Sequence, residues 1–221
     1  MVRLVSIQVG MPKIFGDEGG FRPDRSWSSA ILKESVTGPV WLGELNLAGD
    51  RQDDLAVHGG PDQSILGYSA GHYPHWREEL DRPEFPYGAF GENFTIDGLD
   101  EDRVSIGDTF EIGEVVIQVT SPRGPCWKIA RRHGIPNLTA RVEQLGWTGW
   151  YYRTLREGAV EAGQEFTRIG RPHPEWTIRR VAATRRGQDL DALVELAALP
   201  ELAERYRSSV RHRIERLGEP T

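Results

Sequence analysis

Glycine and proline interrupt the chain at short intervals from its first residues to about residue 166. The 221 residues include 25 Gly and 14 Pro, which favour turns and shorten regular elements. The runs between them suit short strands better than long helices. Strands are predicted at 3–9, 39–45, 64–69, 92–96, 108–113 and 114–121.

The last two of these strands are predicted to form a hairpin around Gly113. Apolar residues alternate there with polar or smaller ones, at Phe110, Ile112, Val115, Ile117 and Val119. That period of two is typical of a sheet with one buried face.

Three short helices are expected among the strands. Ser69 is expected to cap the first, Pro125 to start the second, and Asn137 to cap a third that Gly146 ends. Many short strands with few helices are typical of a closed or partly closed β-barrel. The predicted fold class is therefore mainly β with α.

The chain changes character at RPHPEW, residues 171–176, where two prolines break the pattern. Three amphipathic patterns follow: from Thr177 to Gly187, over 190–196, and from Pro200 onward. The predicted units are a β-barrel over 1–170 and a small three-helix C-terminal unit over 171–221. Residues 168–221 carry 11 Arg against 8 Asp and Glu, a net charge of +3. A solvated helical face explains this charge better than nucleic-acid binding does.

Composition excludes several classes of protein. The net charge of −6 gives no overall attraction to nucleic acid or anionic lipid. A single cysteine rules out an internal disulfide, an all-cysteine zinc site and an iron–sulfur cluster within one chain. No run approaches the roughly 18 apolar residues of a membrane span, and the N-terminus lacks an export signal. A cytoplasmic protein is expected, with neither membrane nor nucleic acid as partner.

Several sequence signatures of cofactor sites are missing. There is no G-x-G-x-x-G after a strand, no Walker loop, no H-E-x-x-H and no G-x-S-x-G. The chain shows no nicotinamide or flavin site of its own, so any redox chemistry would take electrons from another protein.

The single cysteine, Cys126, lies in the run SPRGPCWK. A free cysteine is usually a small buried apolar residue. Here Arg123 and Lys128 flank it, and Pro125 would place it at a helix N-terminus, all of which favour the thiolate. The thiolate is the form that binds metals and attacks electrophiles. Of these two roles, the preferred prediction is that Cys126 holds a redox metal cofactor.

Other candidates lie in turn-rich segments. His58 precedes Gly59 and Gly60, whose backbone can turn sharply and approach a ligand; a locally bonded turn histidine is the equal alternative. Arg51 and Arg123 are candidate anion ligands because guanidinium binds phosphate with two parallel hydrogen bonds. A surface ion pair is the alternative role for any one of the 24 arginines.

Five runs stand out in the sequence: GDRQDDLAVHGGPD, GAFGENFT, IGDTFEIG, SPRGPCWK and TGWYYR. In their order and spacing they resemble the MOSC family, which is named after the C-terminal domain of molybdenum cofactor sulfurase. The resemblance covers nearly the whole chain and is strongest to the YiiM-like branch, which carries an appended three-helix domain. It implies a MOSC β-barrel that binds the pyranopterin molybdenum cofactor, with Cys126 as the metal's protein thiolate.

The resemblance also implies reduction of N-hydroxylated small molecules, such as hydroxylaminopurines and hydroxylamines, to amines. An electron-donating reductase protein would be the partner, and a homodimer is left open. Family descriptions attach pyridoxal phosphate binding too, but Lys128 is the one lysine in a candidate segment.

Residue roles follow from this resemblance together with the candidates above. His58 or Glu92 would protonate the departing amine. Arg51 and Arg123, with backbone N–H groups of Gly59 and Gly60, would hold the cofactor phosphate. Asn93 would bond the edge of the pterin. Two other readings stay open: a cofactor carrier or sulfur relay without turnover, and an interaction module whose Arg-rich tail docks a partner.

Overall fold

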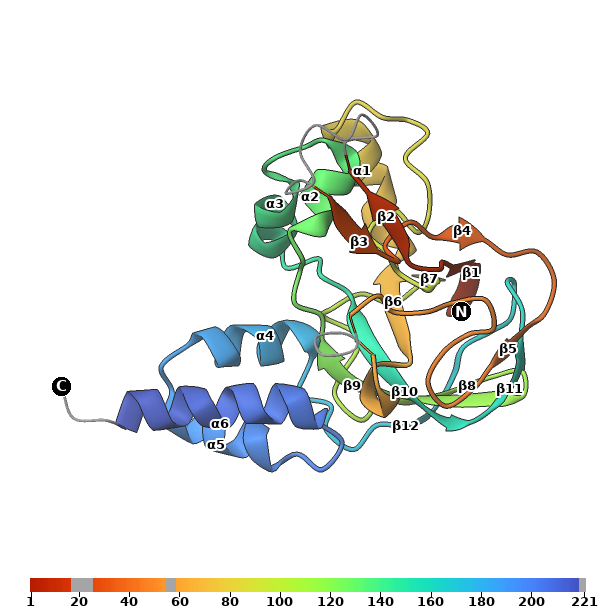
Figure 1. The fold of residues 1–221 in the computed structure, drawn as a ribbon. Coiled ribbons are helices and arrows are strands. Elements are labelled where there is room, and N and C mark those ends of the chain that lie inside the picture. Colours follow the sequence, from red (N-terminus) through yellow and green to blue (C-terminus); the bar gives the residue numbers. More distant parts are fainter. Residues whose placement is uncertain (17–25, 55–58, 219–221) are drawn as a thin grey trace.

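The computed structural model describes residues 1–16, 26–54 and 59–218 (Figure 1). The strands are β1 Arg3–Val9, β2 Lys13–Phe15, β3 Trp27–Ser29, β4 Glu34–Ser35, β5 Val40–Leu42, β6 Ile65–Ser69, β7 Phe94–Asp97, β8 Thr109–Ile112, β9 Val115–Pro122, β10 Trp150–Arg156, β11 Gly158–Val160 and β12 Thr167–Gly170. The helices are α1 Tyr73–Glu79, α2 Lys128–His133, α3 Leu138–Leu145, α4 Ile178–Arg186, α5 Leu190–Ala198 and α6 Glu204–Gly218, with 3-10 turns η2 Pro61–Gln63 and η3 Ala70–His72.

The main sheet has the strand order β12-β8-β9-β10-β6-β7-β1-β4. Its pairs are antiparallel except for β6 and β7, which run parallel. The sheet curls until the segment leading into β12 meets β1. There Leu4 N donates to Gln164 O (2.9 Å), and Gly163 N donates to Leu4 O (2.7 Å). These bonds join the two sides of the sheet, so the predicted β-barrel fold is confirmed.

The predicted hairpin is confirmed in detail. β8 and β9 pair with Ile112 opposite Val115, across a turn in which Gly113 has a φ of 57°. Phe110, Ile112, Val115, Ile117 and Val119 are all at most 1% exposed. The alternating apolar residues therefore form the face of the hairpin that packs in the barrel core, as the period of two predicted.

Gly67 on β6 lets two aromatic rings enter that core. A Cβ added there would lie 2.8 Å from the Tyr152 ring and 3.2 Å from Trp150 Nε1. We expect Gly67→Ala to lower the free energy of unfolding by about 1–3 kcal/mol, because neither buried ring has room to move. Urea unfolding would measure the loss. Gly124→Ala is the control, since no atom of the described residues lies within 4 Å of a Cβ there. Equal stability of both variants with wild type would contradict this packing account.

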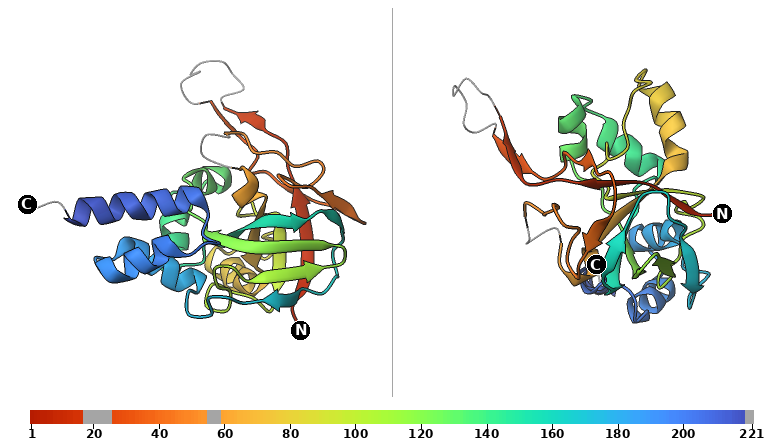
Figure 2. Two further views of the ribbon diagram at one scale, coloured as in Figure 1. Left: turned by 90° about the horizontal axis from the view of Figure 1, so that it is seen from below. Right: turned by 90° about the vertical axis from the view of Figure 1, so that its right-hand side faces the viewer.

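A helical layer of α1, α2 and α3 covers one end of the barrel (Figures 1 and 2). It has its own apolar core, built around Tyr73, Trp76, Phe90 and Leu138. Ser69 caps the turn before α1 by accepting from Gly71 N, and Gly146 ends α3 with a φ of 69°, both as predicted. Asn137 occupies the cap position of α3, but its side chain makes no capping bond.

The tail folds into α4, α5 and α6, which extend from another end of the barrel (Figure 2). Thr177 caps α4 as predicted, whereas Asp189, not predicted, caps α5. The third helix begins at Glu204 instead of Pro200. The reason is that Ala203 N donates to Thr120 O of β9 (3.0 Å), so the chain is bound to the barrel before the helix starts.

The barrel and the tail share one apolar core. Val104 of the barrel belongs to the same buried cluster as Ile178, Val181 and Leu193 of the tail. Arg171, in the predicted linker, makes a bidentate ion pair with the buried Asp108, at 2.8 Å for each bond. The two predicted units therefore meet through packed side chains. In the part of the chain that the structure describes, no helix is long and apolar enough to cross a membrane.

Candidate functional site

One pocket gathers residues from most of the segments that the sequence singled out. Arg51, Gly59, Asn93, Arg123 and Cys126 all line it. Its cavity volume is about 100 Å³, and the pocket opens to solvent. Segments far apart in the sequence thus converge where β9 and the loop after β5 meet the helical layer.

Cys126 lies in the turn between β9 and α2. Its carbonyl oxygen accepts from Ile129 N (3.0 Å) and from the Thr139 hydroxyl of α3 (3.2 Å). Its side chain is free and partly exposed, so the thiol lines the pocket from a fixed main chain. The prediction that Pro125 starts a helix was wrong. α2 begins two residues after Cys126 and has six residues, so its dipole adds little field at the thiol.

Arg123 is the buried cation of the pocket. Arg123 N donates to Gly149 O (3.1 Å), which extends the ladder of β9 and β10 by one residue. The residue is 7% exposed, and its Nη1 is buried without a hydrogen-bond partner among the described residues. Leaving a buried charged donor unpaired is costly. This nitrogen therefore indicates room for an acceptor that a ligand would bring.

Arg51 lies at the pocket as well, but its side chain is exposed. Its backbone N–H donates to Gly10 O (3.0 Å), which fixes the loop after β5 against the end of β1. Gly59 and Gly60 have φ values of 86° and 89°, a conformation that favours glycine. Gly59 lines the pocket. His58 lies outside the described residues, so its predicted role stays a prediction.

A buried polar network forms another side of the pocket. Lys33 pairs with Asp50, and the side chains are 8% and 1% exposed. Asp50 also accepts from Gly10 N (2.7 Å) and from Asn93 Nδ2 (2.8 Å). Burial lowers the pKa of the Lys33 amino group, and the Asp50 carboxylate raises it in part. Sequence reasoning did not find Lys33, because it lies in no turn-rich segment.

Asn93 has its side-chain amide committed to the fold. Its Nδ2 donates to Asp50 and to Gln8 O (3.2 Å), and its Oδ1 accepts from Leu66 N (3.1 Å). Both amide hydrogens are therefore used. The structure assigns Asn93 a role in holding the pocket wall and does not support the predicted bond to a pterin edge.

Glu92 also serves the fold. It is fully buried and accepts from Gly88 N (2.7 Å), Phe90 N (3.2 Å), the Thr95 hydroxyl (3.1 Å) and the Tyr73 hydroxyl. It is not among the described residues that line the pocket. Because its carboxylate already accepts four hydrogen bonds and does not line the pocket, the structure does not support Glu92 as the proton donor.

Charge in the pocket favours an anionic ligand. Asp50 is paired with Lys33, and Asp53 lies 3.4 Å from the Lys128 ammonium. The guanidinium groups of Arg51 and Arg123 then stay uncompensated among the described lining residues. Pyridoxal phosphate, an aldehyde, would react with a lysine. Two lysines line this pocket, Lys33 in addition to the predicted Lys128, and each is paired with a carboxylate.

Two histidines that are close in sequence, His72 of η3 and His75 of α1, are each paired with a carboxylate. His72 Nε2 lies 2.7 Å from Glu101, and His75 Nε2 lies 2.6 Å from Glu79. Within the described ranges, no group of three or more His, Cys, Asp or Glu side chains could hold a metal.

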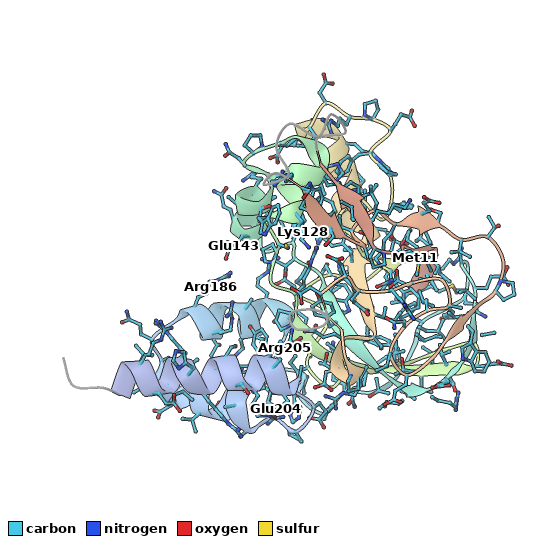
Figure 3. All side chains as sticks on the ribbon, viewed as in Figure 1. Met11, Lys128, Glu143, Arg186, Glu204 and Arg205 are labelled. Carbon is cyan, nitrogen blue, oxygen red and sulfur yellow. The ribbon has the colours of Figure 1, made fainter. Side chains whose placement is uncertain are left out.

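The tail reaches the same region. Arg205 lies at the end of α6 nearest the barrel, and Lys128 lies across from it in the helical layer (Figure 3). Burial raises the pKa of Tyr151, which lines the pocket, and the positive charges of Arg123 and Arg205 oppose this rise. Glu143 of α3 and Arg186 of α4 make a 3.7 Å ion pair that links the tail to the helical layer (Figure 3).

The fold and the pocket define a class: a small β-barrel with a helical layer and one thiol in a positively charged pocket. The MOSC domain matches residues 54–167, and the chain belongs to the MOSC family. The Bacillus subtilis protein YflK is 35% identical over 97% of this chain and 95% of its own length.

Solved structures agree with this assignment. The crystal structure of YiiM from Geobacillus stearothermophilus is 32% identical and covers 97% of this chain and all of its own, with a TM-score of 0.80.

A protein named "Reductase" from Gibberella moniliformis is 33% identical over 78% of this chain, but the match spans 32% of the fungal protein.

Proposed function

We propose that this chain is a molybdenum-cofactor-dependent reductase that converts N-hydroxylated small molecules, such as hydroxylaminopurines and hydroxylamines, to amines. The observation that carries the proposal is that one pocket is lined both by the chain's single cysteine and by Arg123, whose buried Nη1 has no hydrogen-bond partner among the described residues. A MOSC-family chain with a relative named a reductase supports the redox class.

The residues present fit a phosphorylated metal cofactor. Arg51 and Arg123 would bind its phosphate, since no carboxylate among the described lining residues pairs with them and the buried Nη1 of Arg123 has no acceptor there. Cys126 would add a thiolate to the soft sulfur ligands that molybdenum accepts. When bound, the cofactor would supply a two-electron reduction of the N–O bond.

The reaction consumes two electrons and two protons, breaks the N–O bond, and yields an amine and water. The chain must therefore deliver protons to the pocket. Lys33 is the described proton donor that best meets this need, since the residue lines the pocket and its Nζ hydrogen-bonds Asp50. Asp50 would keep the ammonium in place, and Asn93 would keep Asp50 in place.

Electrons would come from a separate reductase protein. The sequence contains no dinucleotide fingerprint that would hold a nicotinamide or flavin. The tail, with its net charge of +3 over 168–221, is the surface that would attract an acidic donor.

The test compares protein purified from two hosts, one that makes the molybdenum cofactor and one that does not. We expect only the first preparation to contain molybdenum and pterin, and to reduce hydroxylaminopurine with a reduced viologen dye as electron source. Elemental analysis, pterin fluorescence and chromatography of the amine give the three readouts. Protein that binds the cofactor but turns over nothing would favour the carrier alternative, and protein without metal from both hosts would reject the proposal.

A further inference from the structure

Two tryptophans, Trp127 exposed and Trp27 half-buried, form an aromatic surface beside the pocket. Trp27 lies on β3, and Trp127 directly follows Cys126. Their ring centroids are 5.8 Å apart at an interplanar angle of 57°. Arg131 of α2 lies over both rings, at 5.7 Å from Trp27 and 5.6 Å from Trp127. We call Trp27, Trp127 and Arg131 the aromatic platform.

The platform is continuous with the pocket. A second depression is lined by Trp27, Ser28, Asp53, Asp54, Trp127 and Lys128. Asp53 and Lys128 also line the pocket that contains Cys126. A ligand resting on the platform would therefore need to extend only past these two side chains to reach the thiol.

Packing does not explain the exposed ring of Trp127. Trp127 is 52% exposed, and large aromatic side chains are costly to leave in water. Trp27 is held from behind, where Phe15 of β2 stacks on it at 4.5 Å and 24°. The platform is thus a supported aromatic surface, and the half-exposed ring of Trp127 can contact a flat molecule.

Hydrogen-bonding groups lie at its edge. The Ser28 hydroxyl donates to Asp53 Oδ2 (2.9 Å), and the Lys128 ammonium donates to Ser28 O (2.7 Å). These bonds hold the Asp53 carboxylate at the junction of the two depressions. A carboxylate there can accept from ring N–H or amino groups of a heteroaromatic compound.

We propose that the aromatic platform selects substrates, by stacking on the planar ring of an N-hydroxylated aromatic compound whose N–OH group enters the pocket toward Cys126. This inference rests on the proposed function for the reaction, while the stacking itself needs no chemistry. Trp127 is a specificity-determining residue, and compounds without a ring gain nothing from it.

The binding arm of the test uses adenine, a planar purine that cannot be reduced at an N–O bond. Isothermal titration calorimetry compares the adenine affinity of wild type with that of Trp127→Ala. Both proteins are purified from the cofactor-making host and from the host that lacks the cofactor. Loss of one stacking partner should weaken adenine binding by about fivefold to a hundredfold. Trp127→Phe should restore most of the affinity. Trp41→Ala is the control, because Trp41 is 53% exposed on β5 and lines neither depression.

The kinetic arm compares hydroxylaminopurine with N-methylhydroxylamine, which has no ring. Trp127→Ala should raise KM for the purine by a similar factor and leave the KM of the small compound unchanged. The proposed role of the platform would be overturned if Trp127→Ala left the adenine affinity unchanged, or if Trp41→Ala lowered it equally. Equal changes in KM for both substrates in Trp127→Ala would also overturn it. Adenine binding that depends on Trp127 in protein that reduces nothing would support the platform and reject only the reaction.

Discussion

Cys126→Ser is expected to lose most of its molybdenum while keeping its fold. The serine hydroxyl is a harder and less readily ionised ligand than a thiol, so it should bind the metal poorly. Removing a direct ligand should cost metal affinity about tenfold or more, since even supporting groups around metal ligands are worth that much. The bonds that fix residue 126 use its carbonyl oxygen, which serine retains.

Elemental analysis of the variant and the wild type, purified side by side from a cofactor-making host, gives the molybdenum content per chain. Thermal unfolding and circular dichroism check that the fold is retained. Equal metal content in two folded proteins would remove Cys126 as the metal ligand. If pterin stays while molybdenum falls, the thiolate holds the metal and the arginines hold the rest of the cofactor.

Arg123→Ala and Arg51→Ala are expected to yield protein depleted in pterin and molybdenum. A charge-assisted hydrogen bond to a phosphate is worth about 1.5–3 kcal/mol, or roughly tenfold to a hundredfold in affinity. We expect Arg123→Ala to have the larger effect, because its guanidinium is buried and Arg51 is exposed. Lysine at either position should restore only part of the binding, since it lacks the planar fork.

Stability of cofactor-free protein separates this role from a structural one. A buried cation destabilises the empty protein when one of its nitrogens has no partner, as for Nη1 of Arg123 within the described ranges, so cofactor-free Arg123→Ala should be at least as stable as wild type in urea. Arg216→Ala is the matched control, an exposed arginine in the last turn of α6. Arg205 is unsuitable as a control because its charge acts on Tyr151. Wild-type pterin content in both pocket variants would mean that the phosphate lies elsewhere.

The sequence predicted those parts of the fold whose local pattern matched their burial. β1 covers the predicted 3–9, and the β8–β9 hairpin alternates as its residues do. The strand β10 was missed, although it lies between β6 and β9 in the sheet. Glycines bracket it at Gly149 and Gly158, which made the segment resemble a loop. Its long-range pairing with two other strands outweighed that local signal.

The candidate site shows a similar division. Motif order brought Arg51, Arg123 and Cys126 to one pocket, where the structure also places them. A sequence motif does not show which polar side chains are hydrogen-bonded within the folded protein. Glu92 and Asn93 therefore resembled ligand-binding residues, although their side chains bond other residues of the chain. Lys33 was not predicted as a site residue, because it lies in no motif. Only the folded chain brings it to Asp50, 17 residues away.

The core shared by barrel and tail limits how this chain can exchange parts with its relatives. A recombinant joined at residue 171 would set one parent's Val104 against another parent's Ile178 and Val181, side chains that pack in one cluster here. Interiors are close-packed, so volumes on both sides of such a junction have to match. Arg171 and Asp108 would be separated into different parents in the same way. The helices of the tail and the barrel wall they cover are thus expected to be inherited, and to vary, as a pair.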